Sequence, residues 1–345
     1  MSLQALLGTD LPLIQAPMAG FQGSALAAAV CNAGGLGSLP CGLLTLEGMR
    51  QELRALQAQT GKPFNVNFFC HAPPEPNAAR EAAWQAALAP YYAEFGVAGA
   101  SVLTGPGRSP FTSDAAALLD EFRPAIVSFH FGLPAPELLA RARQHGAKIL
   151  SSATTIEEAQ WLEAHGADAI IAQGLEAGGH RGHFLSDDLS KQMGTYALLP
   201  QMVRAVRVPV IATGGIADRA GVAAAMALGA AGVQVGTAFL LCPEASISAV
   251  HRAALKSANV QHTALTNLFS GRPARGIVNR LMREMGPMSA LAPPFPLATN
   301  AIAPLRAKAE SRGSGDCSPL WSGQNATGCR EIPAAALTRE LAGVP

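Results

Sequence analysis

Eight short apolar runs recur along the first 240 residues, and this recurrence constrains the fold more than any other feature of the chain. Each run ends in glycine, proline or polar residues. Most runs are continuous rather than alternating, which is typical of strands buried on both faces of a parallel sheet. The runs are 12–18, 35–39, 64–69, 125–130, 148–153, 169–173, 209–213 and 232–238.

Helix-like segments lie between these runs, at 25–32, 47–58, 136–144, 155–163 and 218–228. Two of them end in a His-Gly pair, where glycine is the usual residue just past a helix. Strand and helix that alternate about eight times over this length predict a TIM (β/α)8 barrel. The alternative is a doubly wound open sheet. It is disfavoured because the functional-looking residues follow many strands instead of gathering at one switch point.

The remaining segments do not follow this alternation of strand and helix. Residues 72–107 are rich in alanine and proline with a weak helical pattern, and we interpret them as an excursion between the third and fourth strands. From 243 to 310 the chain reads as helices broken by proline-rich loops, which predicts a helical cap domain over the carboxyl-terminal face of the barrel. We therefore expect a barrel at 1–242, this domain at 243–310, and a loop and C-terminal segment at 311–345 that returns to the barrel.

Composition excludes several classes of protein. Of the 345 residues, 49% are hydrophobic and 14% charged, and the formal net charge is +1, so there is no basic stripe for nucleic acid. No apolar run approaches the roughly 20 residues of a membrane span, and the N-terminus lacks a secretory signal pattern. Six scattered cysteines are interpreted as small buried hydrophobes. We expect a soluble cytoplasmic protein with no membrane or nucleic-acid partner.

Two neighbouring strands end in glycine-containing segments suited to a phosphate group. One is Thr213-Gly-Gly-Ile216, ahead of a helix-capping Asp218, and the other is Gln234-Val-Gly-Thr237. In a TIM barrel the loops after the seventh and eighth strands present backbone N–H groups to a phosphate. The alternative is that these glycines only serve tight turns. The candidate cofactor-binding residues are Gly214, Gly215, Gln234, Val235, Gly236 and Thr237.

Two common nucleotide-binding motifs are absent from the sequence, and their absence narrows the class of cofactor. There is neither a GxGxxG fingerprint nor a Walker loop, so a mononucleotide such as FMN fits better than a dinucleotide. Asn67 and Gln173 end strands in amides that either read the edge of an isoalloxazine ring or cap loop carbonyls. Ala16, Pro17 and Met18 end the first strand, where the methionine either packs against a flavin face or fills the core.

Two histidines follow strands. The segment 172–182, AQGLEAGGHRG, uses several glycines, Gly178 and Gly179 among them, to place His180, and His130 ends a strand in SFHFG. A histidine takes or gives a proton near neutral pH, so we predict that both are catalytic, the alternative being satisfied core histidines. His180 and His183 form an HxxH pair, but no carboxylate or cysteine completes a metal site, so no metal is expected.

Two later segments are further candidates for contact with this site. SGRPARG at 270–276 carries two arginines in a rigid turn, which suits an anion or the barrel rim. Trp321 and Gln324 either approach the cofactor or, in the case of the tryptophan, anchor the returning tail.

The motifs LIQAPMAG, PFNVNFF, SFHFG, AQGLEAGGHRG, PVIATGGI, GVQVGTAF, SGRPARG and LWSGQ span essentially the whole chain. Their order resembles that of nitronate monooxygenases, formerly called 2-nitropropane dioxygenases, and most resembles the bacterial class I group. The resemblance implies a TIM barrel with non-covalent FMN and an added, mostly helical substrate domain. It also implies oxidation of alkyl nitronates, such as propionate 3-nitronate, by O2 to a carbonyl compound plus nitrite, without a nicotinamide.

By the same resemblance, His180 is the catalytic histidine and His130 a second active-site histidine. His180 pairs with the nitronate anion, or abstracts the α-proton if a neutral nitroalkane is accepted. Flavin contacts are implied at Asn67, Gln173, Gly178, Gly215 and 234–237, with Met18 near the ring.

The sequence departs from the family in one place and leaves other functions open. Where the family has a tyrosine-containing segment, this chain has 295–300, FPLATN, and its only tyrosines are Tyr91, Tyr92 and Tyr196. The main alternative is an NAD(P)H-dependent FMN reductase, similar to enoyl-acyl-carrier-protein reductases or quinone reductases. A phosphate-sugar barrel enzyme without flavin and a non-catalytic flavin-binding barrel are further alternatives. We expect a monomer or homodimer.

Overall fold

The computed structural model describes residues 2–75, 77–97 and 108–344. Eight parallel strands form one sheet in the order β1-β9-β8-β6-β5-β4-β3-β2. A parallel bridge between Ile14 and Leu36 joins its two edges, so the sheet closes into the predicted TIM barrel. The strands are β1 (Leu13–Gln15), β2 (Ser38–Pro40), β3 (Asn65–Phe69), β4 (Ile126–His130), β5 (Lys148–Ala153), β6 (Ala169–Gln173), β8 (Val210–Thr213) and β9 (Gly232–Val235).

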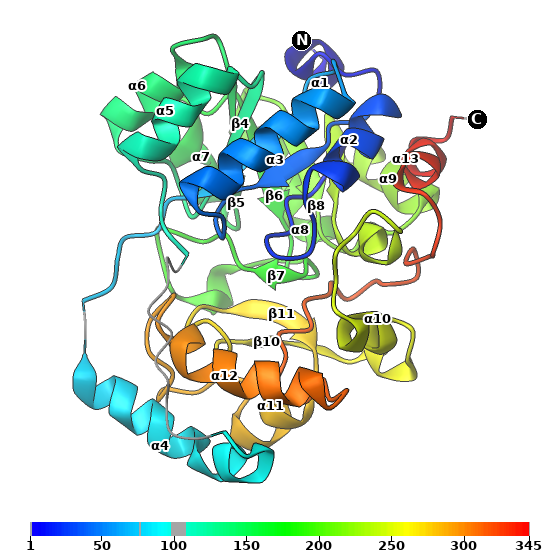
Figure 1. Cartoon of the computed structure of the whole chain (residues 1–345). Helices are drawn as coiled ribbons and strands as arrows, with labels where there is room; N and C mark the ends of the chain where they lie inside the picture. The colour runs from blue at the N-terminus through cyan, green and yellow to red at the C-terminus, as the bar shows by residue number, and fades with distance from the viewer. Residues whose placement is uncertain (1, 76, 98–107, 345) are drawn as a thin grey trace.

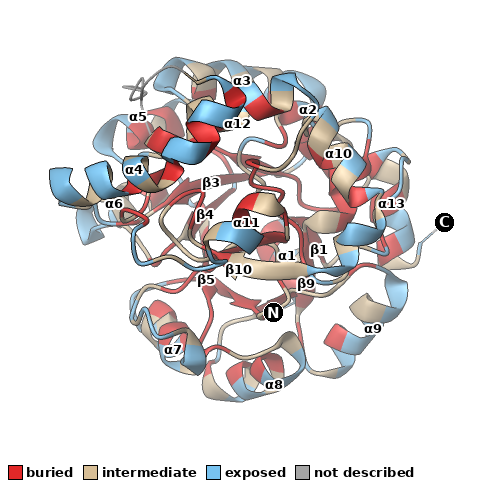
Figure 2. Cartoon of the chain, turned by 90° about the horizontal axis from the view of Figure 1, so that it is seen from below, coloured by how far each residue is buried: buried red, intermediate tan, exposed pale blue. Residues whose placement is uncertain are grey.

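Helices surround the strands, with their buried faces turned inward (Figure 2). Side-chain caps start several of them: Thr155 accepts from the Glu158 N–H at 3.2 Å, and Asp218 accepts from the Gly221 N–H at 2.8 Å. The surrounding helices are α2 (Ser24–Asn32), α3 (Leu46–Gln59), α5 (Ser113–Phe122), α6 (Pro136–Arg143), α7 (Ile156–Ala164), α8 (Thr195–Ala205), α9 (Arg219–Ala227) and α13 (Ala334–Ala342).

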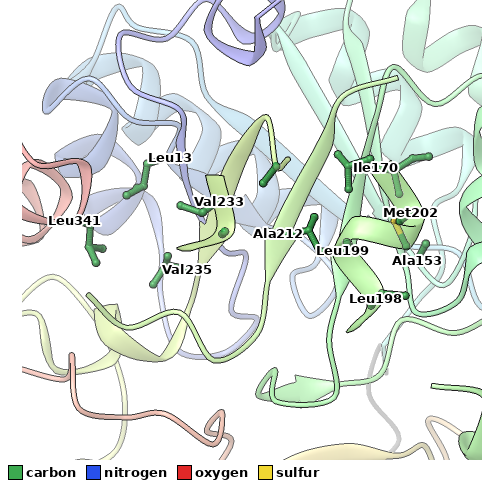
Figure 3. Close-up of a cluster of buried hydrophobic side chains, with 14 of the residues drawn as sticks. Leu13, Ala153, Ile170, Leu198, Leu199, Met202, Ala212, Val233, Val235 and Leu341 are labelled. Carbon is green, nitrogen blue, oxygen red and sulfur yellow. The ribbon is translucent and has the colours of Figure 1, made fainter. Parts of the chain in front are cut away.

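Alternate residues of each strand build two parts of the core. Outward-facing Leu13, Ile170 and Val233 pack against the helices, where Leu198 of α8 and Leu341 of α13 join them (Figure 3). The inward-facing residues between them, Ile14 and Ile171 among others, form a separate cluster with the side chains of α1 (Leu3–Leu7). Helix α1 thus closes the amino-terminal end of the barrel, and the carboxyl-terminal end is left for a site.

A second layer covers the carboxyl-terminal end (Figure 1). Its sheet has the order β10-β11-β7, in which β11 pairs antiparallel with β7, so Ala274 lies opposite His180. The elements of this layer are α4 (Ala78–Phe95), β7 (Gly179–His180), α10 (Ala249–Leu255), η3 (Ala258–Gln261), β10 (Thr263–Thr266), β11 (Ala274–Ile277), α11 (Arg280–Met285) and α12 (Ala298–Ser311). Two short 3-10 helices, η1 (Leu189–Lys191) and η2 (Thr237–Leu241), complete the secondary structure.

Several bounds differ from the sequence prediction. The first apolar run, 12–18, is strand only at β1, and the second, 35–39, overlaps β2 only at its end. The eighth apolar run, 232–238, is strand only to Val235, after which the chain turns into η2. The excursion at 72–107 contains the 18-residue helix α4, although residues 76 and 98–107 lie outside the described part. Helix α4 packs on α12, where the Trp84 indole donates to the Ala298 carbonyl at 3.3 Å and the Tyr92 hydroxyl to the Ala301 carbonyl at 2.6 Å.

Two further findings concern membrane-spanning helices and disulfide bonds. None of the helices they form is long and apolar enough to cross a membrane. All six cysteines are free thiols, and four of them are buried.

Candidate active site

A large cavity opens where the barrel strands end, with about 1270 Å³ of empty space that is partly continuous with solvent. Every residue predicted for the cofactor and catalytic sites lines it. They are Ala16, Pro17, Met18, Asn67, His130, Gln173, Gly178, Gly179, His180, Gly214, Gly215, Gln234, Val235, Gly236 and Thr237.

Sequence reasoning missed several lining residues. Ser152 is the next-to-last residue of β5, so the same strand-end rule would have found it, whereas Ser128 lies in the middle of β4. Arg108 and Asn325 come from segments outside the strands, where no periodic pattern marks them. Trp321 lines the cavity, as one of its two interpretations expected.

One side of the cavity offers unpaired backbone donors. Gly214 and Gly215 have φ of 119° and 72°, a conformation that favours glycine. The N–H groups of Gly215 and Gly236 have no acceptor among the described residues. The Asn325 amide donates to the Gly215 carbonyl at 3.0 Å, which holds this turn in place. The donors suit an anionic group such as a phosphate.

The amide side chains that line the cavity differ in whether their oxygen atoms have hydrogen-bond partners. The Asn67 amide nitrogen donates to the Ser128 hydroxyl at 2.9 Å, and its oxygen has no partner among the described residues. The Gln234 Oε1 atom is buried and unpartnered in the described structure. Because a buried acceptor without a donor is costly, it indicates a missing ligand donor. Gln173 instead holds the loop, donating to the His180 carbonyl at 2.9 Å and accepting from the Gly182 N–H at 2.7 Å.

Glycines bring His180 to the cavity. A Cβ at Gly178 would lie 2.5 Å from the Gly323 nitrogen, so only glycine allows this approach. Gly179 has φ of 71°, and a Cβ there would meet nothing within 4 Å. The His180 Nε2 lies 2.8 Å from the Oγ of the fully buried Ser270. Burial, and then the charge of Arg108, hold the pKa of His180 well below its ordinary value, so the imidazole is neutral at pH 7.

His130 is held by both of its ring nitrogens. Nε2 lies 3.2 Å from the His180 carbonyl, which can only accept, so Nε2 carries the proton. Nδ1 therefore accepts from the Ser152 hydroxyl at 3.0 Å. Burial lowers the pKa of His130 to about 3, so this histidine is also neutral at pH 7.

A fully buried arginine that sequence reasoning missed lies beneath the loop. Arg181 donates to the carbonyls of Gly174 and Gln173, both at 2.8 Å, and to the Gln192 Oε1 at 2.7 Å. It thereby ties the end of β6 to the segment that carries His180. Its position beside His180 in the sequence was the only available signal.

Aromatic rings pack around His180. Phe69, Phe131 and Phe295 make one cluster, and the Phe131 and Phe295 ring centroids lie 6.1 and 5.3 Å from that of His180. Phe131 has φ of 72°, a strained conformation for a residue with a Cβ. The Trp321 ring lies 5.6 Å from His180 on another side.

The tyrosines of the described chain do not line the cavity. The Tyr91 hydroxyl bonds to Glu284 at 2.8 Å, the Tyr92 hydroxyl to Ala301, and Tyr196 is exposed on α8. In the described ranges no three histidine, cysteine, aspartate or glutamate side chains gather to hold a metal ion.

Comparisons with known proteins agree with this arrangement. A family model for nitronate monooxygenase matches residues 1–343. The nitronate monooxygenases of Paraburkholderia phytofirmans and Pseudomonas aeruginosa are each 46% identical to this chain, over 99% and 97% of it and 93% and 96% of their own lengths.

Among solved structures, nitroalkane oxidase from Streptomyces ansochromogenes is 41% identical, with a TM-score of 0.90 over 99% of this chain and 97% of that one. FabK from Thermotoga maritima is 27% identical, with a TM-score of 0.73 over 99% and 94% of the two chains. The match over the whole length shows that this chain is an enzyme of the nitronate monooxygenase family.

Proposed function

We propose that the protein binds FMN and oxidises alkyl nitronates, such as propionate 3-nitronate, with O2 to a carbonyl compound and nitrite. The observation that carries this proposal is the convergence of every predicted cofactor residue on one cavity whose lining includes a neutral, half-buried His180. The same resemblance that named these residues implies this reaction, and the chain belongs to the corresponding family.

The residues present fit FMN. The N–H groups of Gly215 and Gly236 would hold the phosphate, since they have no acceptor in the described part of the chain. The unpartnered Gln234 Oε1 and the Asn67 Oδ1 would accept hydrogen bonds from the isoalloxazine edge, and Met18 would pack on the ring. When bound, FMN supplies the electron acceptor for the nitronate and the means to reduce O2.

His180 would hold the substrate through its second nitrogen. Nε2 is engaged by Ser270, whereas Nδ1 has no hydrogen bond within the described residues. If the Ser270 hydroxyl donates to Nε2, Nδ1 carries a proton and donates to a nitronate oxygen. If Nε2 carries the proton, Nδ1 is a base for the α-proton of a neutral nitroalkane. A nitronate substrate therefore requires the first arrangement.

His130 would act as a positioning residue in this reaction. Both of its ring nitrogens are engaged, one by the carbonyl of His180 itself. It would thus keep His180 oriented instead of exchanging a proton with the substrate.

Oxygen uptake tests the proposal. We expect purified, FMN-loaded protein to consume O2 and release nitrite when propionate 3-nitronate is added without NAD(P)H. A yellow, FMN-loaded protein that shows no uptake would contradict it.

A further inference from the structure

We propose that Arg108 binds a carboxylate at the far end of the substrate, so that the enzyme selects nitronates carrying a second anionic group. This inference rests on the proposed oxidation of nitronates, and it assigns a charge-selecting residue to the same cavity. Arg108 is a lining residue of that cavity.

Arg108 lies away from the proposed phosphate side. It belongs to the segment between β3 and α5, whereas Gly214 and Gly215 follow β8. In the closed sheet order β3 and β8 stand on opposite sides of the barrel. A cofactor phosphate at the glycines therefore leaves Arg108 for another anion.

The Arg108 guanidinium is held in place by its neighbours. Its Nη1 donates to the Thr299 hydroxyl, which in turn donates to the Phe269 carbonyl at 3.0 Å. The Cζ atom lies 5.6 Å from the Phe295 ring centroid, a cation–π contact that fixes the plane of the group. Two contacts thus orient the guanidinium and leave N–H donors for a ligand.

Within the described ranges, no carboxylate neutralises the charge of Arg108. Arg108 has no ion pair in the described part of the chain, and the stretch 98–107 contains no aspartate or glutamate. Burial lowers the pKa of Arg108 to about 10, so the group is still protonated at pH 7. A planar carboxylate binds an arginine guanidinium through two parallel hydrogen bonds. An arginine that faces a cavity without an ion-pair partner is suited to bind a ligand carboxylate in this way.

A second arginine adds to the positive field around His180. The Arg272 Cζ lies 4.2 Å from the Phe131 ring centroid, and the Phe131 and Phe295 rings lie 5.4 Å apart. Arg272 donates to the His183 carbonyl, and its buried Nε has no partner among the described residues. Two cations stacked on the aromatic rings beside one neutral histidine favour a substrate with more than one negative charge.

Arg108→Met tests the proposal through selectivity. We expect this variant to lower the ratio of kcat/KM for propionate 3-nitronate to kcat/KM for propyl-1-nitronate on the order of 100-fold, since only the first substrate has the carboxylate. Arg108→Lys keeps the charge and should restore much of the ratio. The matched control is Arg312→Met, because Arg312 is exposed and stacks on Phe95 at 5.7 Å, away from the cavity. An unchanged ratio in Arg108→Met would overturn the proposal.

Binding separates this inference from the proposed function. By calorimetry, we expect wild-type holoenzyme to bind 3-nitropropionate at least about tenfold more tightly than 1-nitropropane, and Arg108→Met to remove that preference. If the preference holds while no nitronate is oxidised, the proposed function fails and the anion site stands. If nitronates are oxidised but both ligands bind alike in the wild type, the Arg108 inference fails alone.

Discussion

Burial and neighbouring positive charge act in the same direction on His180. Both disfavour the imidazolium, and Ser270 fixes one ring nitrogen at 2.8 Å. The imidazole of His180 is therefore a neutral group whose Nδ1 has no partner among the described residues, which distinguishes it from His130, whose two nitrogens are both engaged.

His180→Asn should lower kcat/KM for propionate 3-nitronate on the order of 100-fold or more, because the shorter amide cannot reproduce the imidazole's position or proton chemistry. FMN content, measured by absorbance, should be unchanged. The matched control is His165→Asn, since His165 stacks on the Trp161 ring of α7 outside the cavity. Equal activity of His180→Asn and the control would refute a catalytic role.

Buried neutral histidines make the protein sensitive to acid. Burial lowers the pKa of His251 to about 4, whereas its unfolded value is about 6.5. Between these values the unfolded chain binds the extra proton, so stability is full above pH 6.5 and is lost as the pH falls toward 4. The slope is about 1.4 kcal/mol per pH unit for one group.

His251→Gln should therefore make the free energy of unfolding less dependent on pH between 6.5 and 5, as measured by urea denaturation. His251 donates to the Trp321 carbonyl at 3.0 Å, a bond that glutamine can retain. His165→Gln, at an exposed position, serves as the comparison and should leave the slope unchanged. Equal slopes for both variants would show that His251 does not titrate in this way.

Residues at strand ends were the predictable part of the site. His180 and the glycines line the cavity as expected, because the carboxyl ends of barrel strands meet at one face. Asn67 also lines the cavity, but the prediction that it ends a strand was wrong, since β3 continues to Phe69. Arg108 was not predictable, since it depends on a non-strand segment reaching back over the barrel. Residue type alone did not decide between the two roles proposed for Gln173, contact with a flavin or capping of a loop. In the structure its amide holds the loop through the backbone of His180 and Gly182.

At the scale of elements, the loop from β6 to β7 joins the barrel to its second layer. Pairing of β7 with β11 places His180 opposite Ala274, and Gly178 passes close to the backbone of Gly323. The strands themselves were predictable from continuous apolar runs. Helix α4 was not, since alanines on several sides weaken its periodicity and its burial depends on α12.

Gly178→Ala should lower the free energy of unfolding by about 2 kcal/mol and reduce FMN retention, because the new methyl group would overlap backbone atoms. The added Cβ would lie 2.5 Å from the Gly323 nitrogen and 2.6 Å from the Ser322 carbonyl carbon. Gly61→Ala is the matched control, as a Cβ there meets nothing within 4 Å. Urea denaturation and flavin absorbance check both variants, and a Gly178→Ala protein as stable as the control would contradict the packing argument.

At the scale of the whole molecule, the second layer covers the end of the closed barrel at which the cavity opens, and its strand β7 contributes Gly179 and His180 to the lining. Barrel closure followed from the number and spacing of apolar runs, whereas the way α4, α12 and β11 cover the open end depends on contacts between distant segments. Such contacts leave no periodic trace in a single sequence.

The most direct measurement compares electron donors in the absence of oxygen. FMN-loaded protein is mixed anaerobically with propionate 3-nitronate and, separately, with NADH and NADPH, and the visible absorbance of the flavin is followed. We expect the nitronate to bleach the flavin within seconds and both nicotinamides to leave it oxidised. Bleaching by a nicotinamide but not by the nitronate would contradict the account and identify an NAD(P)H-dependent reductase.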